Sequence, residues 1–307
     1  MPHRVLAHAK VNLSLRVLAR EAGGYHQVES LFCALELADE IEVALDGGDG
    51  IRLDVASPTD VITPPPDLGP VEQNLAWRAA AAFAGRAGTS PGIAIRLAKR
   101  IPHGAGLGGG SSDAAAVLRA LNTLHGDRLP REALLDIAAG LGSDVPFFLT
   151  GAALALAWGR GGRLAPLPAL PARPVVLAVP RQRVGTADAY EALARTRGRE
   201  QPHAAAVIDL PIRDWADAAR GSVNDFEDIV FRDIPALHEV RELLDRSGAL
   251  LARMTGTGSV VFGVFENADA AAAAADRLRA LGGDIDVITT ATLGSVAGPE
   301  PDASRPA

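Results

Sequence analysis

The first segment of the chain alternates apolar and polar side chains over residues 4–17, a period of two that predicts an extended strand with two different faces. The apolar face carries Val11, Leu13, Leu15 and Val17, and the polar face carries Lys10, Asn12, Ser14 and Arg16. The short sequence EAGGYH, residues 21–26, follows as a hairpin-like turn. The apolar stretch LFCALELADEIEVAL, residues 31–45, then predicts a second extended segment.

Helical spacing begins after a loop rich in proline and aspartate, which runs from residue 57 to residue 70. The stretch NLAWRAAAAFAGRAG, residues 74–88, has helical composition, and GIAIRLAKRI, residues 92–101, predicts a strand. From Ser112 the apolar positions recur at steps of three and four residues until Gly126, which predicts a helix of about 12 residues. A second helix is predicted from residue 130 to residue 141.

A proline-spaced stretch, LAPLPALPARP at residues 164–174, separates the two halves and predicts an interdomain connection. The second half combines the strand PVVLAVP, helical segments at 187–195 and 235–247, the loop TGTG entering another strand, and an alanine-rich helix after Asn267. We therefore predict an α+β protein with domains 1–168 and 169–297 and a disordered tail, residues 298–307.

Composition narrows the class of protein. The 307 residues include 48% hydrophobic and 22% charged side chains, as in ordinary globular proteins. A net charge of −7 gives no field for gathering nucleic acid or anionic lipid. The single cysteine, Cys33, cannot form an internal disulfide, and no segment has the length of a signal-peptide core or membrane span. These features predict a cytoplasmic protein.

Glycines gather directly before the predicted helix that follows residue 110. The run from Gly104 to Gly110 is followed by Ser111 or Ser112 as a helix cap and by Asp113 in the first turn. Bare amides beside a helix N-terminus form a cradle for an anion such as phosphate. A flexible connector is the simpler interpretation, but a connector does not need a helix start immediately after it.

Two nucleotide motifs compare poorly with this loop. Gly104, Gly106 and Gly109 satisfy the dinucleotide pattern G-x-G-x-x-G, but the motif comes some hundred residues into the chain, so a nicotinamide enzyme is only a formal alternative. The P-loop pattern is absent because no lysine follows the glycines.

The stretch PHGAGLGGGSSDAA resembles the phosphate-binding signature of the GHMP kinases, the superfamily of galactokinase, homoserine kinase and mevalonate kinase. The stretches AKVNLSL, GGYH, LGSDVPFF and TGTGSVVF resemble other family motifs, in the family's order, across residues 7–265. The resemblance implies a two-domain α+β fold, with an N-terminal nucleotide-binding domain, a C-terminal ferredoxin-like α/β domain and the active site between them. The ATP site that it implies comprises Lys99, Pro102, Gly104, Gly106, Leu107, Gly108, Gly109, Gly110, Ser111 and Ser112.

The resemblance also implies a catalytic pair, since phosphoryl transfer needs a residue that orients or deprotonates the acceptor hydroxyl. Asp144 of GSDVP would accept that proton, and Lys10 of AKVN would keep Asp144 ionised and steady the transferring group. Asn12 would help to place substrate. The residues alone leave simpler roles open: a helix cap for Asp144, a solvated strand residue for Lys10 and a charge at the sheet edge for Lys99.

The branch of the superfamily that this chain most resembles phosphorylates diphosphocytidyl methylerythritol, a small-molecule substrate. The resemblance implies that Tyr25 and Tyr190 flank the cytosine ring, that His26 reads its edge and that Thr186 lies nearby; surface aromatics are the alternative. Mg²⁺ should arrive with ATP, with Ser112 as the protein contact expected for it, and no protein-bound zinc is expected. A homoserine or mevalonate kinase and a non-catalytic sensor remain rival functions. No nucleic-acid or membrane partner is expected, and the protein is expected to be a monomer or a homodimer.

Overall fold

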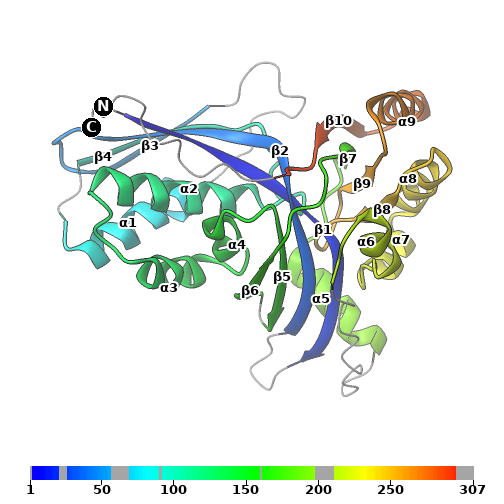
Figure 1. The fold of residues 1–307 in the computed structure, drawn as a ribbon, viewed down its shortest axis with the longest axis horizontal. Coiled ribbons are helices and arrows are strands. Elements are labelled where there is room, and N and C mark those ends of the chain that lie inside the picture. The colour runs from blue at the N-terminus through cyan, green and yellow to red at the C-terminus, as the bar shows by residue number, and fades with distance from the viewer. Residues whose placement is uncertain are drawn as a thin grey trace.

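The computed structural model describes residues 2–20, 26–56, 69–89, 92–159, 161–197 and 211–294. Two β-sheets organise this part of the chain, and helices pack on both of them (Figure 1). The two longest strands, β1 (His3–Arg20) and β2 (His26–Leu45), pair along nearly their whole length and run from one sheet toward the other.

The first sheet has the order β3-β4-β2-β5-β6, with β1 paired to β2 off this path. The later part of β2 pairs with β4 and its early part with β5, so β2 lies at the centre. All pairs are antiparallel except β3 with β4. The remaining strands of this sheet are β3 (Gly50–Ala56), β4 (Gly92–Ala98), β5 (Leu154–Gly159) and β6 (Arg163–Leu167).

Helices of the first half lie together on one side of this sheet (Figure 1). The central helix, α2, is buried at each residue from Ala114 to Leu118, because alanine side chains let it pack close to its neighbours. The largest buried side chains here are Phe83 and Phe147. The elements are a 3₁₀ turn η1 (Val71–Gln73), α1 (Leu75–Ala87), α2 (Gly109–Leu124), α3 (Arg131–Leu141) and α4 (Val145–Thr150).

The second sheet is antiparallel and has the order β10-β7-β9-β8. Read along the chain, this is fourth, first, third, second, with helices in the crossover connections, which is the ferredoxin-like arrangement that the resemblance predicted. The elements are β7 (Pro174–Pro180), α5 (Thr186–Arg197), α6 (Trp215–Arg220), α7 (Glu227–Asp233), α8 (Pro235–Arg246), β8 (Leu251–Met254), β9 (Val261–Val264), α9 (Ala268–Leu281) and β10 (Ile285–Ala291).

The two halves share backbone contacts and a core. The amide of Leu15 in β1 donates to Val223 O at 2.7 Å, and Asp225 N donates back to Leu15 O at 3.0 Å. One buried cluster combines Leu13 and Leu31 of the first sheet with Leu177 of the second. Groups on β1 are therefore held in a fixed relation to loops of the second half.

Three sequence predictions need correction. Helix α2 begins at Gly109, with Gly108 as its N-cap, because Gly108 has a left-handed φ of 73° and its carbonyl accepts the first helical bond, from Ser112 N. Ser111 and Ser112 therefore lie inside the first turn and do not cap the helix, and Asp113 lies beyond the first turn. The predicted connection at 164–174 is partly a strand, since β6 extends to Leu167.

Other features were not predicted or cannot be compared. Strands β3, β5, β8 and β10 and the short helices α6 and α7 had no separate sequence signal, and α4 was indicated only by the possible helix cap at Asp144. Most of the predicted turn at 21–26, the loop from 57 to 68 and the tail at 298–307 lie outside the described residues. The domain boundary at residue 168 stays a prediction.

Candidate active site

Lys10 lies on β1, between two irregularities in the pairing of β1 with β2, where bulges redirect strand side chains. It is 3% exposed, yet its ammonium has three oxygen neighbours. Lys10 Nζ donates to Asn12 Oδ1 at 2.8 Å and to Gly106 O at 3.0 Å, and lies 3.4 Å from Asp144 Oδ2. The ring of Phe32 lies below it, 5.2 Å from Nζ. The buried charge is thus fully oriented by its partners.

Asp144 occupies the N-cap position of α4, but its side chain makes no capping hydrogen bond. The sequence left open whether Asp144 caps this helix or meets Lys10, and the carboxylate lies beside Lys10. The Asp144 side chain is 29% exposed, so it is reachable from outside while Lys10 is sealed beneath it. A carboxylate in this position can accept a proton from a hydroxyl that approaches from the open side.

Asn12 is a hub between three segments of the chain. Its Oδ1 accepts from Lys10 Nζ, from Thr255 Oγ1 at 3.0 Å and from Gly256 N at 2.9 Å, and its Nδ2 donates to Ser30 Oγ at 2.7 Å. Asn12 therefore fixes Lys10 and the TGTG loop, and its predicted contact with substrate stays a prediction.

The glycine loop, residues 104–110, packs tightly against β1 and against the TGTG loop. A side chain at Gly106 would overlap the carbonyl oxygen of Thr255, and one at Gly108 would come within 2.9 Å of the Phe148 ring and 3.1 Å of Lys10 Cγ. Both glycines also have positive φ values, 78° and 73°. Glycine is required here because protein backbone and Lys10 lie so close.

The remaining loop residues differ in what they present. Pro102 and Leu107 are buried, and the Leu107 carbonyl accepts from Lys10 N at 2.9 Å. At Gly110 the nearest atom to an added side chain is Leu75 Cδ1, at an ordinary 3.6 Å. Helix α2 starts without a side-chain cap and without an acidic residue in its first turn. The first amides of this helix therefore fit an anion, whereas Ser112 is buried and its N–H already donates to Gly108 O.

Lys99 lies at the end of β4 and is enclosed by two buried carboxylates. Its Nζ binds Asp39 Oδ2 and Asp113 Oδ2, the latter at 2.8 Å, and Asp39 Oδ1 also accepts from Ile101 N at 2.8 Å. Burial opposes the charge of Lys99, but the two carboxylates outweigh it and raise its pKa. These contacts support a role in anchoring the start of the glycine loop more than the predicted contact with nucleotide.

Asp113 is the member of this cluster whose ionised form is disfavoured. Burial, followed by the nearby charge of Asp39, raises its pKa to about 8 against the opposing effect of Lys99. Its Oδ1 has no hydrogen-bond partner among the described residues. Asp113 is therefore protonated more readily than an ordinary aspartate.

The structure brings two of the predicted substrate residues together. The rings of His26 and Tyr190 stack with centroids 4.7 Å apart, and Tyr190 meets Phe226 edge-on at 4.9 Å. Burial raises the pKa of Tyr190 to about 12, and the charge of Asp144 adds to this, so the aromatic group lies within electrostatic range of Asp144. A base on the Tyr190 face that His26 covers would have to displace His26. Tyr25 lies outside the described residues.

Thr186 begins α5, and its Oγ1 lies 3.3 Å from Thr257 Oγ1 of the TGTG loop. Sequence reasoning missed Asn224, whose Nδ2 donates to Met254 O at 2.7 Å and to Gly256 O at 2.9 Å. Asn224 supports the TGTG loop from behind. No motif signalled it, since its partners are backbone atoms some thirty residues away.

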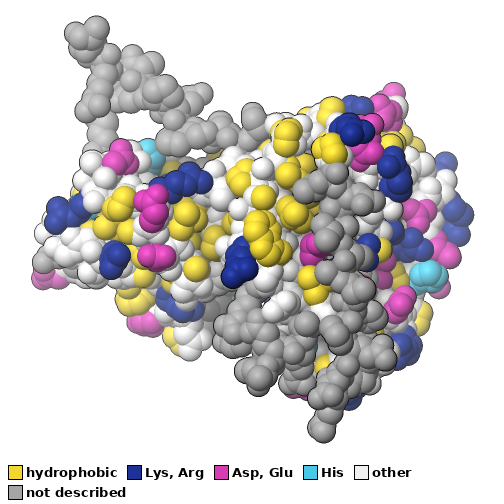
Figure 2. All heavy atoms as spheres, turned by 60° about the horizontal axis from the view of Figure 1, so that its bottom comes forward, with side chains coloured by type: hydrophobic (Ala, Val, Ile, Leu, Met, Phe, Trp, Pro, Cys, Tyr) yellow, Lys and Arg dark blue, Asp and Glu magenta, His cyan; other side chains and the backbone are white. Residues whose placement is uncertain are grey.

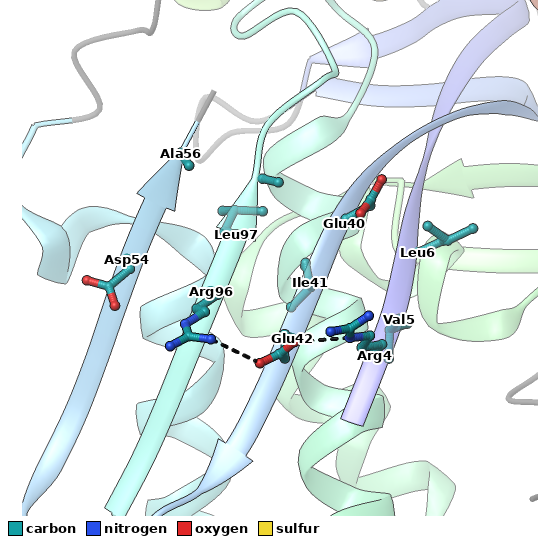
Figure 3. Close-up of a pocket in the computed structure, with 11 residues that line it drawn as sticks. Arg4, Val5, Leu6, Glu40, Ile41, Glu42, Asp54, Ala56, Arg96 and Leu97 are labelled. Atoms are coloured by element: carbon teal, nitrogen blue, oxygen red, sulfur yellow. Dashed lines mark hydrogen bonds and ion pairs between the residues drawn. The ribbon is translucent and has the colours of Figure 1, made fainter. Parts of the chain in front are cut away.

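A second region of the described chain is hollowed but lies apart from the predicted site residues. A cavity of about 510 Å³ lies over strands β1 to β4, on the face turned away from the helices, where Glu42 bridges Arg4 and Arg96 (Figure 3). It contains none of the predicted site residues. Acidic and basic side chains intermingle on the face drawn in Figure 2. Among the described residues there is no helix able to span a membrane and no group of three His, Cys, Asp or Glu that could hold a metal.

Comparison with known proteins agrees with this architecture. The family model for the GHMP kinases N terminal domain matches residues 74–152, and that for the GHMP kinases C terminal domain matches residues 205–284. A homoserine kinase structure from Cytophaga hutchinsonii has the same fold, with a TM-score of 0.68 at 21% identity over 97% of this chain and 96% of that one. The molecule is thus a two-domain GHMP kinase, and this family belongs to the phosphotransferases.

More similar relatives carry a narrower name. The 4-diphosphocytidyl-2-C-methyl-D-erythritol kinase of Geobacter sulfurreducens is 41% identical over 89% of this chain and 94% of its own length, and that of Solibacter usitatus is 40% identical over 86% and 81%. A crystal structure of 4-(cytidine 5'-diphospho)-2C-methyl-D-erythritol kinase has a TM-score of 0.72 at 37% identity, covering 94% of this chain and 99% of that one. The chain belongs to the 4-diphosphocytidyl-2-C-methyl-D-erythritol kinase family.

Proposed function

We propose that the protein transfers the γ-phosphoryl group of ATP to the 2-hydroxyl of 4-diphosphocytidyl-2-C-methyl-D-erythritol, a step of non-mevalonate isoprenoid precursor synthesis. The observation that carries the catalytic assignment is the ion pair of Lys10 and Asp144, 3.4 Å apart beside the glycine loop. The substrate assignment is supported by the names of the relatives, which match most of the chain.

In this mechanism Asp144 accepts the proton of the acceptor hydroxyl as that oxygen bonds to the γ-phosphorus. The bond between the γ-phosphorus and the β–γ bridging oxygen breaks, and ADP leaves with the electron pair. Lys10 keeps Asp144 ionised and in place, and its positive charge offsets the charge that develops on the transferred group. Asn12 and the Gly106 carbonyl fix the ammonium from below, so it needs no reorganisation during the reaction.

The loop fits a nucleotide polyphosphate. Helix α2 presents first-turn amides with no side-chain cap, and Gly110 has only ordinary contacts around it, so backbone donors are accessible to an anion. Mg²⁺ bound with ATP would neutralise part of the phosphate charge, and Ser112 is the residue expected to contact it. The protein's own part is to place the triphosphate over α2 and the acceptor beside Asp144.

The direct experiment measures ADP formation by the purified protein with ATP, Mg²⁺ and one alcohol at a time. We expect rapid turnover with the diphosphocytidyl alcohol and little with homoserine, mevalonate or the methylerythritol phosphate that lacks cytidine. Equal turnover with homoserine or mevalonate would favour a sister kinase. No ATP consumption with any of these alcohols would favour the non-catalytic sensor.

Recognition of the cytosine is tested at the aromatic group. Stacking of a base on an aromatic ring is worth about 1–3 kcal/mol, so Tyr25→Ala should raise the Michaelis constant for the diphosphocytidyl alcohol about tenfold or more. His26→Ala should act in the same direction, while the constant for ATP stays within about twofold. Tyr190→Phe is the matched control, because it keeps the ring that stacks on His26 and packs on Phe226. Unchanged constants in both alanine variants would remove the cytidine assignment.

A further inference from the structure

A second cavity, of about 300 Å³, lies where the start of the glycine loop meets the second half of the chain. Pro102, His103 and Ala105 form its loop side, and Arg183 and Ser259 belong to its opposite side. Ser259 Oγ donates to Gln182 O at 2.6 Å, which ties the segment carrying Arg183 to the TGTG loop. The cavity is therefore walled by two segments that are both fixed to the site described above.

Arg183 lies directly against the loop backbone. A side chain added at Gly104 would come within 3.3 Å of Arg183 Nη1 and 4.0 Å of Cζ, so the guanidinium rests on this glycine. Gly104 has a φ of 65°, in the left-handed region that glycine favours. The second half of the chain thus places a planar cation on the loop predicted to hold phosphate.

The charge of Arg183 has no carboxylate partner within the described part of the chain. Its neighbour Arg181, which also borders the cavity, is directed to Asp284, with 3.9 Å between Nε and Oδ1. Lys99 is held by two carboxylates and Lys10 by Asp144. Partial burial, followed by the charges of Arg183 and Lys99, lowers the pKa of His103.

We propose that Arg183 binds phosphate oxygens of the nucleotide on the glycine loop, reaching them from the second half of the chain. The proposal rests on the proposed function, since it needs a nucleotide on this loop. A guanidinium presents two parallel N–H groups that match two phosphate oxygens, and such charge-assisted bonds are stronger than neutral ones. Nucleotide bound in this way contacts both halves of the molecule at once.

The test is calorimetric titration of a non-hydrolysable ATP analogue with Mg²⁺, without any acceptor alcohol, into the unmodified protein, Arg183→Gln, Arg183→Lys and Arg181→Gln. We expect Arg183→Gln to bind about tenfold or more weakly, as for loss of a hydrogen bond to a charged group, and Arg183→Lys to bind with intermediate affinity. Arg181→Gln is the matched control, a neighbouring arginine with its own partner, and should stay within about twofold.

Steady-state kinetics with ATP and the diphosphocytidyl alcohol supply the second readout. For Arg183→Gln the Michaelis constant for ATP should rise in parallel with the dissociation constant, while that for the alcohol stays within about twofold. Affinity of Arg183→Gln within twofold of the unmodified protein overturns the proposal, and so does an equal loss in Arg181→Gln, which would indicate a general effect of charge. If the unmodified protein binds the analogue but phosphorylates none of the alcohols, the proposed function fails. The calorimetry still tests whether Arg183 binds the nucleotide. If it binds no analogue, both fail.

Discussion

Lys10 and Lys99 are the only two lysines of the chain, and both are buried against the glycine loop, at 3% and 5% exposure. Their partners differ. Lys10 meets one partly exposed carboxylate and two neutral oxygens, whereas Lys99 is enclosed by Asp39 and Asp113, both almost fully buried. The carboxylate of Asp144 is partly exposed in the first cluster, whereas both carboxyl groups of the second cluster are buried.

This difference separates two uses of the same residue type. A buried ion pair that is open on its carboxylate side can exchange a proton with a substrate, because the acceptor site on the oxygen is reachable. The closed cluster has no such access, and it holds β2, α2 and the end of β4 together. The two lysines therefore stand at two different kinds of site, and the predicted nucleotide contact of Lys99 stays a prediction.

The largest effect is expected from Asp144→Asn, which removes the proton acceptor at nearly constant volume. Turnover should fall by about 10² to 10⁴-fold, the usual range for loss of a general base. The affinity for a non-hydrolysable ATP analogue and the circular dichroism spectrum should stay close to those of the unmodified protein. A variant with more than half of normal turnover would leave Asp144 only its place at the start of α4.

The next effect compares the lysines directly through Lys99→Met and Lys10→Met. Lys99→Met leaves the buried carboxyl groups of Asp39 and Asp113 without their cation and should lower the free energy of unfolding by about 3 kcal/mol or more. Lys10→Met leaves Asp144 partly solvated and Asn12 still bonded to Thr255 and Gly256, so we expect a loss of at most about 1–2 kcal/mol, with a severe loss of turnover.

Urea unfolding followed by circular dichroism measures both stabilities, and ADP formation measures turnover. The contrast is broken if Lys10→Met is the less stable variant, or if Lys99→Met keeps full stability and loses only nucleotide affinity. The latter outcome would restore the nucleotide contact that the sequence predicted for Lys99.

How much of this contrast the sequence could predict depends on the range of the contacts. The strand that carries Lys10 and the helix after the glycine loop follow from local periodicity, and the family motifs singled out Asp144. The approach of Asp144 to Lys10 joins segments far apart in the chain and was implied only by the family resemblance. The approach of Arg183 to Gly104 is equally long-range and was not predicted, because no local pattern encodes it. The sequence placed Asp113 in the first turn of α2. It did not indicate the burial of Asp113 against Lys99, because that contact depends on where β4 ends relative to α2.

The proline-spaced stretch gives a second example. Pro166 lies within β6, which among the described strands pairs with β5 alone and so forms the edge of its sheet. Proline is tolerated there because an edge strand has backbone positions that need no partner. The composition alone therefore predicted a connection where the sheet in fact continues for one more strand.

The last expected effect is a pH dependence, at most modest per pH unit, that distinguishes the closed cluster from the open one. The pKa of Asp113 is raised to about 8 in the folded protein, so between the ordinary aspartate range and pH 8 the folded state holds a proton that the unfolded chain has released. Stability from this group is complete at low pH and is lost as the pH rises through 8, with a slope of at most about 1.4 kcal/mol per pH unit. Asp113→Asn removes this slope, whereas Asp144→Asn keeps it.

Urea unfolding of the unmodified protein and the two variants at pH 5, 6.5 and 8 measures the difference. The raised pKa of Glu227 and the lowered pKa values of His8 and His103 cancel in this comparison, because all three proteins share these groups. If the stability curve of Asp113→Asn runs parallel to that of the unmodified protein, Asp113 is ionised in the folded state and the closed cluster carries a net negative charge.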